Sequence, residues 1–271
     1  MQALSERLDA LLSGSTFARG TVLQFSALKT FEPLLDDLRG RKLLSVTRRG
    51  KYLIFDLDGP RLLVHLSQGG RVALEDPPKG ARTKGGVARL RFDDRPAVLI
   101  REYGTQRKAG LWVLEPGGEG PLEKLGPEPD SEEFRELIRS GTDNRRIHSL
   151  LRDQRTVAGI GRGFSDDILH AARLSPYASL GKLDESEREA LLEAIGAVLE
   201  RALAAERKRT GGLPTKLEGR FVIHHKHGRP CPRCGETMRR VSYEGYEITY
   251  CPACQTSGKI LADRRLSRIV R

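Results

Sequence analysis

The four cysteines of the chain form two pairs, Cys231-Pro-Arg-Cys234 and Cys251-Pro-Ala-Cys254, with sixteen residues between them. Two such turns can hold four thiolates around one tetrahedral Zn²⁺. An all-sulfur site leaves no coordination position for a reacting water, so we expect a structural ion. The alternatives are four unrelated thiols or two disulfides, and disulfides need an oxidising compartment. The opening MQALSERLDALL carries charge where a signal peptide needs an apolar core. We therefore favour zinc.

The positive charge of the chain is concentrated near its C-terminus. Residues 201–271 contain 16 Lys or Arg and 6 Asp or Glu, which accounts for ten of the net eleven positive charges. A basic segment beside a zinc hairpin favours nucleic acid as the partner, because neutralising phosphates releases counterions. No apolar run approaches the roughly 20 residues of a membrane span. We expect a soluble intracellular protein without a membrane partner.

The elements fall into two patterns along the chain. The segment SERLDALLSG has apolar residues at helical spacing and Ser5 as a candidate N-cap. Residues 21–114 then alternate in short runs separated by Gly, Pro and Asp, which predicts an antiparallel sandwich or barrel. The Pro- and Gly-rich residues 115–130 indicate a linker, and helical patterns follow. We predict domains at 1–116, 117–220 and 221–271, with 210–220 as a flexible loop.

A glycine turn lies between two predicted helices. Gly159, Gly161 and Gly163 precede a helix for which Ser165 to Asp167 are candidate caps. Helix, glycine turn and helix together expose backbone N–H groups where a phosphate could bind. Glycines in this pattern often only mark a turn between two elements. Helix–turn–helix elements, however, commonly contact DNA backbones.

The segment RIHSLLRDQRTVAGIGRGFSDDILHAARLSPY, followed by CPRCG and YCPACQTSGK, resembles the formamidopyrimidine-DNA glycosylase/endonuclease VIII family. The strands around RRGKYLIFDL and the LGPEPD segment match in the same order, so the resemblance covers nearly the whole chain. It implies an α+β fold: an N-terminal antiparallel β-sandwich, a helical helix-two-turn-helix domain and a C-terminal β-hairpin zinc finger. It also implies a monomer that flips a damaged base out of duplex DNA.

The resemblance implies a bifunctional reaction. An amine attacks C1′ of the damaged nucleotide and releases the base as a Schiff base forms, and elimination then cuts the strand. An α-amino group, with a pKa of about 8 rather than about 10, is neutral more readily than a lysine. The family uses an N-terminal proline followed by glutamate, whereas this chain opens Met1-Gln2-Ala3-Leu4. Either the start was assigned too late, which we favour, or the chain is a paralogue without the nucleophile.

The resemblance assigns site residues one by one. Lys51 matches a lysine that lies against phosphate and sugar, and we predict that it orients the phosphate or assists proton transfer. Arg162 stands where the glycine turn commonly ends in Asn, and Tyr246 replaces the arginine of the zinc hairpin. Gln68 replaces an intercalating methionine. The predicted DNA-binding residues are Arg49, Lys51, Arg107, Lys108, Gly159, Gly161, Arg162, Arg239 and Arg240.

Histidines near the first cysteine pair could also be metal ligands. His224, His225 and His227 precede Cys231, but four thiolates already complete a tetrahedral site. We therefore expect these three at the surface or facing phosphate, and His65 and His170 packed or hydrogen-bonded in the core.

The resemblance implies a glycosylase and AP lyase for oxidised bases, and we expect it to be bacterial, cytoplasmic and associated with the nucleoid through DNA. A catalytically silent protein that binds damaged or abasic DNA is the alternative. A zinc-ribbon RNA-binding protein would explain the charge, but not the β domain or the glycine turn.

Overall fold

The computed structural model describes residues 1–80, 83–103, 107–209, 221–243 and 245–263. The chain forms two compact units. The first contains Met1–Glu123 and the described residues 206–209. The second contains Lys124–Ala205 and the described residues from 221 onward. The change of unit after Glu123 falls inside the linker expected at 115–130. The three-domain division stays a prediction, and the loop expected at 210–220 lies outside the described residues.

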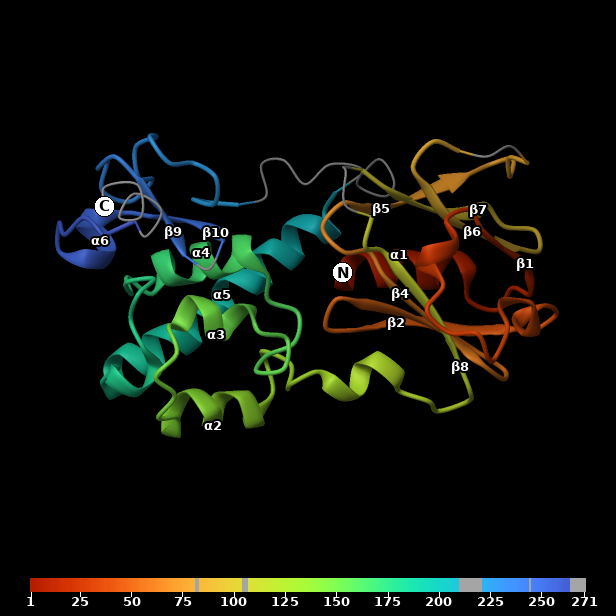
Figure 1. Cartoon of the computed structure of the whole chain (residues 1–271), viewed down its shortest axis with the longest axis horizontal. Helices are drawn as coiled ribbons and strands as arrows, with labels where there is room; N and C mark the ends of the chain where they lie inside the picture. Colours follow the sequence, from red (N-terminus) through yellow and green to blue (C-terminus); the bar gives the residue numbers. More distant parts are fainter. Residues whose placement is uncertain (81–82, 104–106, 210–220, 244, 264–271) are drawn as a thin grey trace. The chain divides into compact units, whose positions relative to one another are not determined.

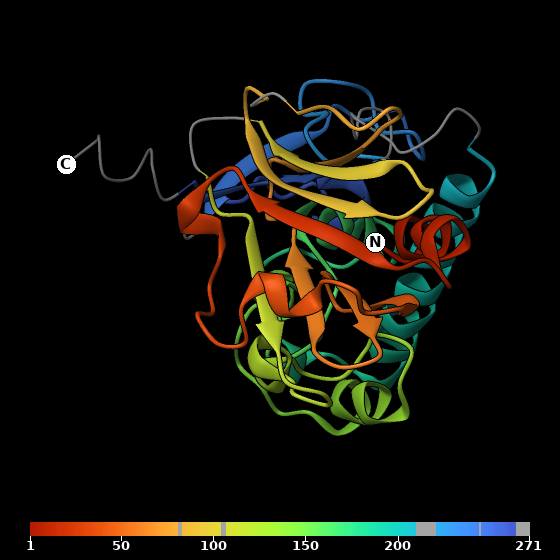
Figure 2. The ribbon, with the colours of Figure 1, turned by 90° about the vertical axis from the view of Figure 1, so that its right-hand side faces the viewer.

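The first unit is a sandwich of two four-stranded antiparallel sheets (Figures 1 and 2). One sheet has the order β1 (Phe17–Val22), β6 (Gly86–Phe92), β7 (Ala97–Glu102) and β5 (Gly70–Glu75). The other has the order β2 (Leu43–Arg49), β3 (Tyr52–Leu57), β4 (Arg61–His65) and β8 (Gly110–Leu114). The sandwich is therefore the correct one of the two β architectures that the alternation allowed.

Alternating apolar residues of both sheets form one core. In β3, Leu53, Phe55 and Leu57 are buried in this core, as the period-two pattern requires. Helix α1 (Gln2–Leu12) adds Leu8 and Leu12 to the same core. The expected N-cap was wrong, because α1 begins before Ser5 and the buried Ser5 hydroxyl donates to the Gln2 carbonyl.

Strand register brings several loops to one edge of the sandwich. Tyr52, the first residue of β3, pairs with His65 at the end of β4, and His65 pairs with Gly110 at the start of β8. In the other sheet, Gly70 at the start of β5 pairs with Glu102 at the end of β7. Lys51 and Gln68 lie in turns beside these strand ends, and Lys108 lies two residues before β8.

The second unit has a helical core of its own. It is formed by α2 (Glu132–Ser140), α3 (Ile147–Arg152), α4 (Arg162–Ala171) and α5 (Glu185–Arg207), whose apolar faces bury residues such as Phe134, Leu150 and Leu169. The hairpin β9 (Arg239–Tyr243) and β10 (Tyr246–Tyr250), with α6 (Pro252–Thr256), contacts α4. This is the helix–turn–helix and hairpin arrangement that the sequence predicts.

Short 3₁₀ helices complete the fold at Phe25–Ala27, Leu35–Leu38, Gly120–Lys124 and Leu180–Lys182. Among the helices in the described part of the chain, none is both long and apolar enough to cross a bilayer.

Candidate functional site

The four cysteine thiols meet in one cluster, all within 4.8 Å of one another. The Sγ atom of Cys234 lies 3.4 Å from that of Cys254 and 3.5 Å from that of Cys251, and the Sγ atoms of Cys231 and Cys254 are 3.9 Å apart. A tetrahedral zinc with Zn–S bonds of about 2.3 Å needs sulfurs about 3.8 Å apart. Disulfide sulfurs lie about 2.05 Å apart. The geometry fits a metal ion and excludes the disulfide alternative for this arrangement.

Local hydrogen bonds shape each cysteine pair. In the first pair, Gly235 N–H donates to the Cys231 carbonyl and Cys231 N–H to that of Glu236, with Gly235 at φ +79°. This is a tight turn that favours glycine. In the second pair, Gln255 accepts from Cys251 N–H through Oε1 and donates through Nε2 to the carbonyl of Leu174. Gln255 therefore ties the second pair to the chain that follows α4.

Lys51 lies in the two-residue turn between β2 and β3. Gly50 supplies the positive φ of +55° that such a turn needs, and Lys51 is half-buried. Tyr52 follows Lys51 in the chain, and the centre of its ring lies 4.7 Å from the centre of the His65 ring. Burial lowers the pKa of His65, and the nearby Lys51 charge lowers it further. His65 is packed as expected, but it faces the charge of Lys51.

Two further loops adjoin this edge. Gln68 is exposed in a turn that the Gly70 N–H closes onto the Leu66 carbonyl. A Cβ at Gly69 would collide with the Tyr103 carbonyl oxygen, so that glycine is required. The predicted pair Arg107 and Lys108 is exposed.

The buried carboxylate of Glu102 anchors the two residues before β8, since it accepts from the backbone N–H of Lys108 at 2.8 Å and of Ala109 at 3.2 Å. Glu102 also raises the pKa of His65, against the larger effect of burial. The structure thus brings Lys51, His65 and Glu102 together. Sequence reasoning missed Glu102, whose position at a strand end looks like an ordinary surface acid.

The side chain of Gln154 stabilises the glycine turn through hydrogen bonds. Its Nε2 donates to the carbonyls of Arg152 at 2.9 Å and Ile160 at 2.8 Å, and its Oε1 accepts from Gly159 N–H at 3.0 Å. The expected exposure of the Gly159 N–H to a phosphate is therefore wrong, because Gln154 already uses that donor. Gly161 is the N-cap of α4, and Arg162 is the first residue of the helix.

Tyr246 meets two arginines beside this turn. The guanidinium carbon of Arg152 lies 3.9 Å from the centre of the Tyr246 ring, and that of Arg162 lies 5.3 Å from it. Tyr246 is 37% exposed, and both arginines are half-buried. Stacking on an aromatic face restricts a guanidinium while leaving its N–H edge able to bind an anion. Three elements, α3, α4 and β10, thus supply one cationic site.

The acidic residues of α4 are structural. Their expected role as caps was wrong, since α4 begins at Arg162 and Ser165, Asp166 and Asp167 are buried within it. Asp166 accepts from His148 at 3.0 Å and from His224 at 2.7 Å. Burial raises its pKa, yet the bonds to the two histidines hold that pKa below its usual value.

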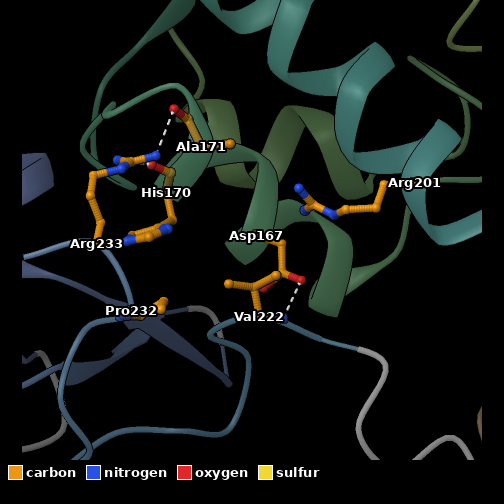
Figure 3. Close-up of a pocket in the computed structure, with 7 residues that line it drawn as sticks. All are labelled: Asp167, His170, Ala171, Arg201, Val222, Pro232 and Arg233. Atoms are coloured by element: carbon orange, nitrogen blue, oxygen red, sulfur yellow. Dashed lines mark hydrogen bonds between the residues drawn. The ribbon is translucent and has the colours of Figure 1, made fainter.

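Asp167 anchors the segment before the hairpin by accepting the N–H groups of Val222 and Ile223 at 2.7 and 2.8 Å; Figure 3 shows the Val222 contact. Burial nevertheless raises the pKa of Asp167.

The histidines before Cys231 divide into two kinds. His224 is buried, so its expected surface position was wrong. His225 and His227 are exposed, as expected, and both face Glu247, which also pairs with Arg240 at 2.9 Å. Arg239 is exposed on the same strand as Arg240.

Family models match most of the chain. The model of the formamidopyrimidine-DNA glycosylase N-terminal domain matches residues 1–112, and that of the formamidopyrimidine-DNA glycosylase H2TH domain matches residues 125–212. A formamidopyrimidine-DNA glycosylase of Thermus thermophilus is 34% identical over 234 residues, which cover 81% of this chain and 84% of the relative. The chain belongs to the formamidopyrimidine-DNA glycosylase family.

Solved structures agree with this assignment. The crystal structure of the MutM (Fpg) protein from Thermus thermophilus matches with a TM-score of 0.79 at 30% identity, over 93% of this chain and 96% of that one. A complex between the Lactococcus lactis Fpg and DNA containing an abasic site matches with a TM-score of 0.80 at 26% identity, over 94% and 97%. Both comparisons span nearly the full length of each protein.

Proposed function

We propose that this protein is a base-excision repair DNA glycosylase and AP lyase that removes oxidised bases from duplex DNA. Family membership and the similarity to a relative in complex with abasic-site DNA support the proposal. The observation that carries it is the cationic site on Tyr246, because two arginines held beside a helix N-terminus are suited to a backbone phosphate.

The proposed reaction begins when a neutral amine attacks C1′ of the damaged nucleotide. The C1′–N bond to the base breaks, a Schiff base forms, and elimination then cleaves the strand. We propose that Lys51 orients the phosphate and sugar or moves a proton during these steps, since its turn is fixed by Gly50 and packed beside His65.

Specific damage recognition requires the duplex to be gripped while the base is extruded. We propose that Arg49, Lys51, Arg107 and Lys108 contact DNA from the first unit. From the second unit, we propose that Gly161, Arg162, Arg239 and Arg240 contact it, with Gly159 shaping the turn. Arg152 joins this group because it shares the Tyr246 ring with Arg162.

The proposed metal is one structural Zn²⁺ bound by Cys231, Cys234, Cys251 and Cys254, whose sulfur separations suit it. The ion would hold the two cysteine turns together and so position β9 and β10. We further propose that the protein acts as a monomer on DNA of the bacterial nucleoid, and that residues 1–116, 117–220 and 221–271 are its three domains.

A strand-cleavage assay tests the function. A labelled duplex with one abasic site should be cut at that site by catalytic amounts of the protein, and an identical duplex without the lesion should stay intact. A duplex with one oxidised base should also release that base. Tight binding of the abasic duplex without cleavage would instead identify a protein that only recognises damage.

A further inference from the structure

The imidazole of His170 reaches into the cysteine cluster from α4. Its side chain is 4% exposed, and its Nε2 lies 3.2 Å from the Sγ of Cys231. This contact joins residues 61 positions apart in the sequence. A metal-bound cysteine is a thiolate without a proton, so the hydrogen of such a bond must come from the imidazole.

The neighbouring residues fix both partners of this contact. Arg233, inside the first cysteine pair, donates through Nη1 to the His170 carbonyl at 2.8 Å and through Nη2 to the Ala171 carbonyl at 3.2 Å (Figure 3). The Arg233 N–H also points at the Cys231 Sγ, at 3.5 Å. Arg233 therefore ties the end of α4 to the first cysteine turn, next to the contact between His170 and Cys231.

The surroundings favour a hydrogen-bonding role over simple packing. A pocket beside the ring is lined by Asp167 and His170 from α4, Arg201 from α5, and Pro232 and Arg233 from the cysteine turn. If His170 served only to fill space beside this pocket, an apolar ring of similar size would serve as well. What imidazole adds is a donor aimed at one of the four sulfurs.

We propose that His170 is a positioning residue of the metal site, whose Nε2–H donates a hydrogen bond to the thiolate of Cys231. The inference rests on the proposed zinc. The bond orients the sulfur and stabilises its deprotonated form, so it strengthens metal retention and makes Cys231 less reactive toward electrophiles. Residues that orient metal ligands in this way typically contribute about 10- to 100-fold to metal affinity.

Two variants separate hydrogen bonding from packing. His170→Phe keeps an aromatic ring and removes the donor, whereas His170→Gln keeps an N–H donor near the position of Nε2. We expect His170→Phe to bind zinc about 10-fold more weakly in competition with a chromophoric chelator. We also expect its Cys231 to be alkylated faster, as mapped by mass spectrometry. His170→Gln should stay close to the wild type in both measurements.

A measurement on the unaltered protein keeps the inference testable if His170→Phe fails to fold. In the zinc-loaded wild type with ¹⁵N-labelled histidine, NMR should find the His170 proton on Nε2. A proton on Nδ1, equal losses in both variants, or wild-type behaviour of His170→Phe would overturn the inference while leaving the zinc site intact. A wild type that binds no zinc would overturn the proposed metal, and this inference with it.

Discussion

The guanidinium of Arg152 stacks on the ring of Tyr246, 3.9 Å from its centre, and the guanidinium of Arg162 approaches the same ring at 5.3 Å. The hairpin of β9 and β10 thus contributes an aromatic ring, and the two helices that flank the glycine turn contribute the charge. One tyrosine on the hairpin therefore meets an arginine from α3 and an arginine from α4.

Replacing Tyr246 with Leu should weaken DNA binding about two- to fivefold, because an exposed cation–π contact contributes about 0.5–1 kcal/mol. Arg162→Ala should weaken binding of all duplex sequences and reduce the salt slope of log K by about one. Fluorescence anisotropy at several salt concentrations measures both effects. Arg135→Ala removes an equal charge from α2 and is the matched control. Affinity that is independent of salt would contradict phosphate binding.

Replacing Lys51 with Ala should lower turnover far more than binding, by about 100-fold or more if the amine takes part in proton transfer. Single-turnover cleavage of an abasic duplex and a binding titration of the same duplex separate the two effects. Lys42→Ala, an exposed lysine just before β2, is the control. An equal loss in binding and turnover would reduce Lys51 to an ordinary phosphate contact.

Replacing Cys234 with Ser should release the metal and weaken DNA binding, since so small a hairpin depends on its ion to fold. Metal content by elemental analysis and affinity by titration should fall together. Glu236→Gln alters an exposed side chain of the same turn and should change neither. Unchanged affinity after complete metal loss would show that the hairpin does not need the ion.

The ion pair between Glu6 and Arg207 should make stability depend on pH. The hydrogen bond from Arg207 lowers the pKa of Glu6 from 4.5 to about 2. A lowered folded-state pKa stabilises the fold fully above pH 4.5, and this contribution is lost as the pH falls toward 2. Thermal unfolding of Glu6→Gln should therefore differ from the wild type at pH 7 and converge with it near pH 2. Glu193→Gln, on the exposed face of α5, should match the wild type throughout.

The sequence predicted what depends on local spacing. Two cysteine pairs sixteen residues apart predicted the thiol cluster, and alternation along residues such as those of β3 predicted an antiparallel β architecture. It failed where a polar residue has a distant partner. Asp166 resembles a helix cap until His148 and His224, 18 and 58 positions away, are brought against it by folding.

The same limit explains the missed residues. Gln154 is an unremarkable polar residue in the sequence, yet its side chain makes three hydrogen bonds, two of them to the glycine turn. In the sequence, Tyr246 is notable only because the resemblance leads us to expect an arginine there. Nothing near it in the chain indicates that Arg152 and Arg162 contact its ring. Such contacts depend on how α3, α4 and the hairpin pack, which no short spacing encodes.

The central claim is that an amine of this protein attacks C1′ at a damaged site. Sodium borohydride reduces a Schiff base to a stable link, so incubating the protein with an abasic-site duplex and borohydride tests the claim directly. We predict a covalent protein–DNA adduct, with the attached amine located by peptide mass spectrometry. No adduct from protein carrying its native N-terminus, under conditions where the duplex is fully bound, would contradict the lyase mechanism.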